Sequence, residues 1–190
     1  MNNIKSATMI LGFLKTFLSS VALLSCLFSS NNVHAQQATN PIIFADVPDM
    51  SMMRVGDTYY MSSTTMHMSP GVPIMKSKDL VNWQLVSYAY DTLANMDELN
   101  LTNGKSAYGL GSWASSIRYH NNTFYVTTFA ATTGKTHIYS TKNIEKGPWK
   151  TVSFKPSYHD HTIFFDDDGK VYLITGVAIP QIKAAVIRAI

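Results

Sequence analysis

The chain has 190 residues, a formal net charge of +3 and a single cysteine. Because the charge is small and no basic stripe runs along the sequence, we expect no nucleic-acid partner. One cysteine excludes an intramolecular disulfide framework, so the fold must be stabilised by its apolar core.

The N-terminal segment has the features of a secretory signal. Lys5 precedes a long apolar run, and Val33 and Ala35 complete a signal-peptidase site. We therefore interpret residues 1–35 as a signal peptide and residues 36–190 as an exported chain, periplasmic or extracellular. Cleavage would remove two lysines and no acidic residue, which lowers the net charge of +3 by two.

Two alternatives stay open for this segment. Its apolar run is almost long enough for a membrane anchor, although Lys15 interrupts it. The stretch Leu23-Leu24-Ser25-Cys26 loosely resembles a bacterial lipobox, and a lipid on Cys26 would make the membrane a partner. In the signal-peptide interpretation, cleavage removes Cys26 and leaves a chain without cysteine.

A hairpin pattern occurs three times, in residues 45–61, 113–126 and 160–173. In each copy, two runs of β-forming residues flank a turn of Gly, Asp or Asn, residue types that tolerate positive φ. A supersecondary unit that recurs at this spacing indicates a radial all-β array.

The first two hairpins have the same sequel, a strand followed by a turn that closes on a tryptophan. Tyr60 and Trp83 are 23 residues apart, and Tyr125 and Trp149 are 24 apart. One unit is therefore two hairpins, or four strands, which is the content of a propeller blade. Residues 91–110 between the units are expected to be a long loop with one helical turn.

The third unit begins in the same way and stops after Gly176. We therefore expect an all-β chain of the β-propeller type with about two and a half blades. The tail, residues 177–190, follows neither the hairpin pattern nor the tryptophan spacing. Unpaired blades would leave open sheet edges, which favour aggregation.

Two aspartates, Asp49 and Asp160, stand just before the first strand of their hairpins. Carboxylates at matching places in different blades would both point to the propeller axis. Glycoside hydrolysis uses such convergent carboxylates, one to activate water and another to tune or supply the acid. The alternative is that each aspartate only stabilises a turn. Asp46 lacks a counterpart in the other repeats and is interpreted as a turn residue or a supporting group.

Trp113 heads the second repeat, and an axial tryptophan could stack on a sugar ring, although it could equally be a core residue. Met66 and His67 are expected to leave the first blade at the end that carries Asp49 and to wall the pocket. His159 and His161 flank Asp160 on one strand face. They could form a metal pair, but without further ligands a structural or substrate-contact role is favoured for both. The acidic turn at residues 166–168 resembles a metal site at first sight, but its place between two strands favours a solvated turn.

Several motifs of the chain, in matching order over about residues 40–176, resemble those of glycoside hydrolase family 43. The motifs are Asn40-Pro41, Ala45–Asp49, Arg54–Met61, Ser69–Ile74, Ser77–Trp83, Gly111–Ala114, Tyr158–Asp160 and Phe165–Tyr172. Members of this family are five-bladed β-propeller enzymes that trim arabinose- and xylose-containing glycans. The resemblance therefore implies a five-bladed propeller and a pentose-containing glycan as substrate.

By this resemblance Asp49 matches the general base that activates water for an inverting attack. Asp160 matches the carboxylate that raises the pKa of the general acid, and Trp113 matches an active-site aromatic residue. The family's acid is a glutamate from a later part of the propeller, and neither Glu98 nor Glu145 matches its place. The resemblance implies no cofactor, although a structural calcium ion is compatible with it.

The sequence thus predicts an exported inverting glycosidase, of the β-xylosidase or α-L-arabinofuranosidase type, cut short before its general acid. A chain of this kind is expected to hydrolyse no aryl pentoside above background. The rival interpretations are a glycan-binding propeller fragment without catalysis and an inactive remnant.

If residues 1–35 are a signal peptide, secreted material should begin at Gln36, because signal peptidase cuts after Ala35. Amino-terminal sequencing of the exported protein measures this directly. Recovery of a chain that keeps a lipid-bearing Cys26 would contradict it and support the lipoprotein alternative.

Overall fold

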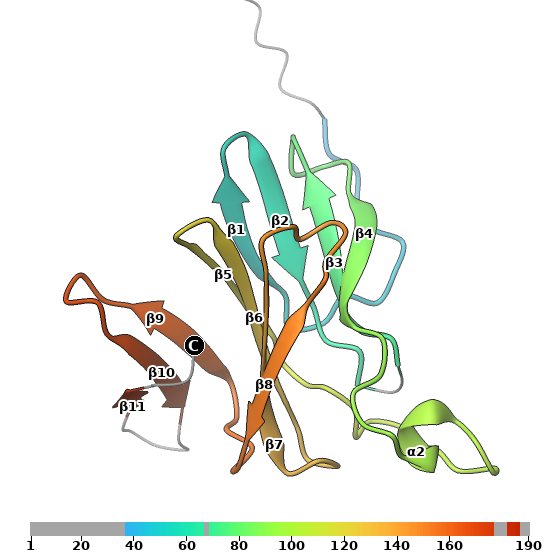
Figure 1. The fold of residues 1–190 in the computed structure, drawn as a ribbon. Helices are drawn as coiled ribbons and strands as arrows, with labels where there is room; N and C mark the ends of the chain where they lie inside the picture. The colour runs from blue at the N-terminus through green and yellow to red at the C-terminus, as the bar shows by residue number, and fades with distance from the viewer. Residues whose placement is uncertain (1–36, 67–68, 177–181, 187–190) are drawn as a thin grey trace, which may run out of the picture. The chain divides into compact units, whose positions relative to one another are not determined.

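Three antiparallel β-sheets follow one another along the chain (Figure 1). The computed structural model describes residues 37–66, 69–176 and 182–186, with side chains described only as far as Gly176 in the last part. The proposed signal peptide, Cys26 and His67 therefore lie outside the described residues. None of the described helices is long and apolar enough to cross a membrane.

In each sheet, neighbours in sequence are neighbours in space, as in a meander. The first sheet contains β1 (Ser51–Val55), β2 (Thr58–Ser62), β3 (Gly71–Ser77) and β4 (Gln84–Tyr90). The second contains β5 (Ser116–His120), β6 (Thr123–Ala130), β7 (Lys135–Thr141) and β8 (Lys150–Phe154). The third contains β9 (His161–Phe165), β10 (Val171–Gly176) and β11 (Ile182–Val186). The prediction of two four-stranded units and part of a third is confirmed.

The first hairpin of each complete sheet turns on residues in the left-handed region, one in the first sheet and two in the second. Gly56 has φ 61°, and Asn121 and Asn122 have φ 46° and 57°. Tight hairpin turns need positive φ because their twist then matches that of the strands, and glycine and asparagine adopt it most readily. The expected helical turn between the first two sheets is also present, as α2 (Asp97–Asn100).

The two tryptophan turns occupy the same place in their sheets. Trp83 directly precedes β4, and Trp149 directly precedes β8. In the first turn, the side chain of Asp79 accepts hydrogen bonds from the backbone N–H groups of Val81 and Asn82, at 2.9 and 2.7 Å. These bonds close the turn locally, which explains why it could be recognised from sequence.

The sheets are joined face to face by apolar side chains. The main core lies between the first and second sheets, with members from both that are less than a tenth exposed. They are Tyr60, Val72, Ile74, Ala89, Tyr90, Ile117, Phe124, Val126, Tyr139 and Ile144. A smaller core of Ile138, Ile163 and Leu173 joins the second sheet to the third. Each sheet thus buries a face against the next, as blades do.

The first strands of the three sheets pack beside one another in the order β1, β5, β9. Hydrogen bonds join their starts. Ser51 Oγ accepts from the backbone N–H of Ile117 at 3.2 Å, and the Ser116 and Thr162 hydroxyls lie 2.6 Å apart. The three innermost strands therefore begin at one end of the array.

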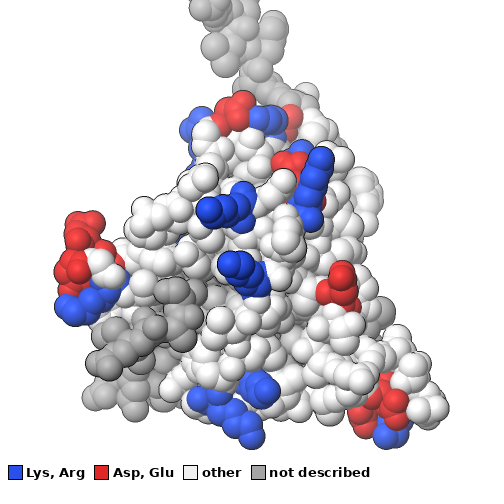
Figure 2. Space-filling model, viewed as in Figure 1, with Lys and Arg blue, Asp and Glu red and all other residues white. Residues whose placement is uncertain are grey.

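A polar contact also joins the first two sheets. Glu145 accepts from Lys76 Nζ at 2.6 Å and from the hydroxyl of Tyr60 at 3.1 Å. Burial, assisted by Glu145, raises the pKa of Tyr60 to about 12, so Tyr60 remains a donor at neutral pH. On the face shown in Figure 2, basic and acidic side chains form small separate groups.

Replacing Glu145 with Gln is expected to lower the free energy of unfolding by less than about 1 kcal/mol, because the ion pair is partly exposed. The hydrogen bond from Lys76 lowers the pKa of Glu145. This contribution is therefore present above the ordinary carboxyl pKa and is lost as the pH falls through the folded-state value. Urea titrations of both proteins across that pH range measure the difference.

Asp57→Asn is the matched control, since its partner Lys78 and Asp57 itself are 62% and 81% exposed. It should leave stability unchanged. An equal loss in the two variants would show that Glu145 does not join the sheets.

Candidate functional site

The sequence-predicted site residues gather where the innermost strands begin. Asp49 lies two residues before β1, Trp113 three before β5 and Asp160 directly before β9. Because the starts of these strands are hydrogen-bonded side by side, all three residues lie at the same end of the array. The strand that follows Trp113 is the middle one of the three.

Asp49 and Asp160 share an unusual backbone conformation. Their φ angles are 49° and 44°, in the left-handed region, which residues other than glycine adopt at an energetic cost. Both side chains are exposed. Strain of this kind persists only where neighbouring contacts hold the segment, and it clusters at functional sites.

The segment that carries Asp160 is held on both sides. The ring nitrogen Nδ1 of His161 lies 2.7 Å from the carbonyl oxygen of Tyr158, and Thr175 Oγ1 donates to the carbonyl oxygen of His159 at 3.0 Å. The backbone N–H of Tyr158 donates to Thr136 Oγ1 at 2.9 Å. These bonds connect the turn to β7, β9 and β10.

His161 is 3% exposed, and its Nε2 atom has no hydrogen-bond partner among the described residues. Burial lowers the pKa of His161, and this effect outweighs the opposing influence of the Tyr158 carbonyl and of Asp160. The neutral ring with its proton on Nδ1 is therefore the form that donates to Tyr158, since a carbonyl oxygen only accepts.

The segment that carries Asp49 is joined to the approach of Trp113. The carbonyl oxygen of Pro48 accepts from the backbone N–H of Thr64 at 3.2 Å. The hydroxyl of Thr64 in turn donates to the carbonyl oxygen of Ser112. Met66 continues this contact, because its N–H donates to Ser112 at 3.0 Å and its carbonyl accepts from Gly111 at 2.9 Å.

Aromatic rings from the second and third sheets meet at this end. The ring centroids of Trp113 and His159 lie 6.5 Å apart in an edge-to-face arrangement. Phe129, near the end of β6, completes a triangle of rings, with its centroid 4.3 Å from that of His159 and 6.2 Å from that of Trp113. Trp113 is 36% exposed, so its ring is neither a core residue nor fully solvated.

The structure therefore brings Trp113, His159 and the backbone of Met66 together, and it places Asp49 and Asp160 at the same end. Sequence analysis did not single out Phe129. Its signal was present, since Phe129 continues the β-forming run of β6 toward this end, but its ring partners could not be identified before the sheets were placed.

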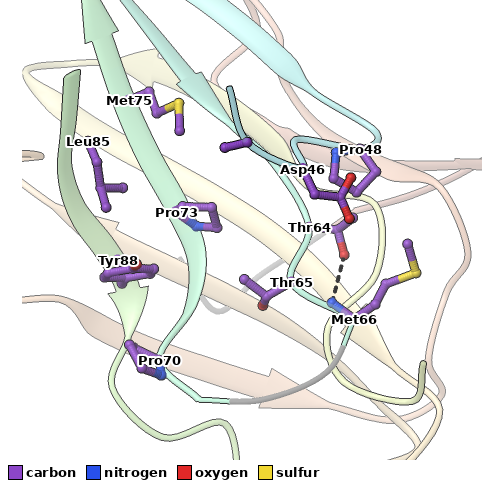
Figure 3. Close-up of a pocket in the computed structure, with 11 residues that line it drawn as sticks. Asp46, Pro48, Thr64, Thr65, Met66, Pro70, Pro73, Met75, Leu85 and Tyr88 are labelled. Atoms are coloured by element: carbon purple, nitrogen blue, oxygen red, sulfur yellow. Dashed lines mark hydrogen bonds between the residues drawn. The ribbon is translucent and has the colours of Figure 1, made fainter. Parts of the chain in front are cut away.

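A pocket of about 390 Å³ adjoins this end on the first sheet (Figure 3). Asp46, for which the sequence leaves open a turn or a supporting role, lines it together with Met66. The other lining residues are Ala45, Pro48, Thr64, Thr65, Pro70, Pro73, Met75, Leu85 and Tyr88. The pocket lies along the outer face of β3 and β4, and Asp49, Trp113 and Asp160 are not among the residues that line it.

Three acidic side chains away from this end have local partners among the described residues. No group of three or more His, Cys, Asp or Glu side chains is placed to hold a metal ion within the described parts of the chain. The acidic turn after β9 is stabilised by a contact between Asp168 and Lys170. Glu98 pairs with Lys105 beside α2, at 3.4 Å, and Glu145 contacts Lys76 and Tyr60.

Comparison with known proteins gives a consistent result. The family model of glycosyl hydrolases family 43 matches residues 38–188. A β-xylosidase of Formosa agariphila is 38% identical, over 77% of this chain and 25% of that protein. A non-reducing end α-L-arabinofuranosidase of Bacteroides ovatus is 36% identical, over 76% of this chain and 27% of its own length. The chain thus spans about a quarter of these relatives.

Solved structures agree. A bifunctional GH43-CE protein of Bacteroides eggerthii matches 81% of this chain with 64% identity and a TM-score of 0.74, and the match covers 20% of that protein. An engineered GH43 enzyme with endo-xylanase and exo-arabinofuranosidase activity matches 78% of the chain with 30% identity and a TM-score of 0.66, over 30% of its length. These neighbours are five-bladed β-propellers, of which the chain covers part.

We expect His161 to be neutral, with its proton on Nδ1, and to titrate below its ordinary value of 6.5. Its contribution to stability is then fully present above pH 6.5 and is lost as the pH falls through the folded-state value. Imidazole nitrogen chemical shifts measured against pH report both the proton position and the pKa.

Two variants are compared as controls. The side-chain amide of His161→Asn can still donate a hydrogen bond to the Tyr158 carbonyl, whereas the side chain of His161→Leu cannot. A proton on Nε2, or titration above pH 6.5, would show that His161 does not hold the Asp160 turn in this way.

Proposed function

The chain belongs to glycosyl hydrolases family 43, and we propose that it forms the water-activating side of an inverting glycosidase acting on xylose- or arabinose-containing glycans. The observation that carries the proposal is the convergence of Asp49, Trp113 and Asp160 at one end of the three innermost strands. The names of the curated relatives, a β-xylosidase and an α-L-arabinofuranosidase, support the substrate class.

Asp49 is the general base in this proposal. Its carboxylate takes a proton from a water molecule, and the oxygen of that water attacks the anomeric carbon from the side opposite the leaving group. Exposure of Asp49 at the strand start leaves room for water beside the carboxylate. The hydrogen bond between Pro48 and Thr64 supports this role, because it fixes the backbone that presents the base.

In this proposal Asp160 raises the pKa of the general acid, and the rings of Trp113 and His159 position the sugar. A negative charge near a carboxylic acid raises the pKa of that acid, which keeps it protonated until it donates to the leaving group. The rings of Trp113 and His159 meet beside Asp160 and offer an apolar surface for a pentose ring. Met66 and His67 flank the same end in the proposal.

The general acid comes from outside this chain. Its only glutamates are Glu98 and Glu145, and both have local cationic partners at other places in the fold. Their positions support an arrangement in which another part of the same protein carries the acid. We also propose export through residues 1–35, a glycan as the partner, and membrane association only if Cys26 carries a lipid.

Glycosyl fluorides separate the base from the acid, because fluoride departs without being protonated by the enzyme. The purified chain should hydrolyse β-D-xylopyranosyl fluoride or α-L-arabinofuranosyl fluoride, with release of fluoride and inversion of configuration. Asp49→Asn should remove this activity. Phenyl pentosides, whose leaving group needs a proton, should not react above background, since acid assistance is typically worth about 10²–10⁴-fold.

Asp57→Asn is the matched control, because Asp57 lies in the hairpin turn at the far end of β1, and it should behave as the unmodified chain. Fluoride release that is equal in the unmodified chain and in Asp49→Asn would show that Asp49 is not the base. Turnover of a phenyl pentoside that disappears in Asp49→Asn would show that an acid does exist within these residues.

A further inference from the structure

Buried side chains and backbone hydrogen bonds hold the loop between the first two sheets at several points. It contains α2 and runs past the end where β1 and β5 begin (Figure 1). Leu99 and Ala107 are each 1% exposed and anchor the loop in the protein. The backbone N–H of Ala107 donates to Glu98 at 2.8 Å, and that of Leu110 donates to Ala107 at 2.8 Å.

The last part of this loop is hydrogen-bonded to the side chain of Trp113. The indole N–H of Trp113 donates to the carbonyl oxygen of Gly109 at 2.9 Å. Gly109 has φ 74°, a conformation that glycine adopts without cost. The next residue, Leu110, is also held, because its carbonyl oxygen accepts from the hydroxyl of Thr132. Tyr108 directly precedes Gly109, the residue whose carbonyl oxygen the Trp113 indole contacts.

Three large apolar side chains are exposed along this short stretch. Tyr108 is 79% exposed, Leu110 50% and Trp113 36%. A single exposed apolar residue is ordinary on a protein surface. A group of exposed apolar side chains on a backbone held by hydrogen bonds indicates a binding surface. The exposed group adjoins the proposed site, which suggests that it binds the same kind of ligand.

We propose that Tyr108 is a second stacking platform for a sugar ring, beside the ring that Trp113 contacts. This inference rests on the proposed function, because it assigns Tyr108 to the neighbouring residue of the same glycan. The C–H faces of a pentose ring pack on the flat face of a phenol, and hydroxyls at the ring edge stay in water. The site therefore binds a chain of at least two pentose residues more tightly than a single pentose.

The test compares the affinity of the full chain for single sugars and for short chains by isothermal titration calorimetry. The probes are xylose and arabinose, with xylotetraose and α-1,5-linked arabinotetraose. Tyr108→Ala should weaken binding of the preferred tetraose by about threefold to tenfold, the range that one aromatic contact contributes. Binding of the corresponding monosaccharide should not change. Tyr108→Phe, which keeps the ring, should retain tetraose binding.

Tyr119→Ala is the matched control, because Tyr119 is also exposed, at 39%, but lies near the far end of β5. It should leave all affinities unchanged. Unchanged tetraose binding in Tyr108→Ala, with normal monosaccharide binding, would overturn the inference and leave the proposed function standing. Failure of the unmodified chain to bind any of the four probes would overturn both.

Discussion

The structure depends on the packing of one sheet face against the next. No strand of one sheet forms a ladder with a strand of another within the described residues, so the contact between the sheets themselves depends mainly on side chains. Ile117 and Val126, both fully buried between the first two sheets, are central to this contact. Because Asp49, Trp113 and Asp160 come from three different sheets, their relative positions are only as fixed as that packing.

Packing between the sheets does not by itself order the loops that carry Asp49 and Asp160. Hydrogen bonds within and beside these loops do. Hydrogen bonds from Thr64 to Pro48 and from Thr175 to His159 fix the residue before each aspartate. Both aspartates adopt positive φ, and these contacts offset its cost. The aspartates are thus held in place before any sugar arrives, which is the arrangement that favours catalysis by positioning.

The repeated four-stranded unit could be predicted from the sequence because the residues that define it act locally. Turn residues such as Gly56 and Asn121 and the tryptophans before β4 and β8 depend on neighbours within a few residues, so their spacing predicted the four-stranded units. The place of Asp49 and Asp160 followed from the same repeat. Phe129 and the pocket lined by Asp46 were not predicted, because both depend on contacts between segments far apart in the chain.

If the three strand starts form one sugar-binding end, amide chemical-shift mapping with xylose and arabinose should show all three responding. The largest shifts should fall in residues 49–50, 112–114 and 158–161, which come from three sheets and should respond together with one affinity. Shifts centred instead on the hairpin turns at residues 56–57 and 121–122, at the opposite ends of the innermost strands, would contradict it.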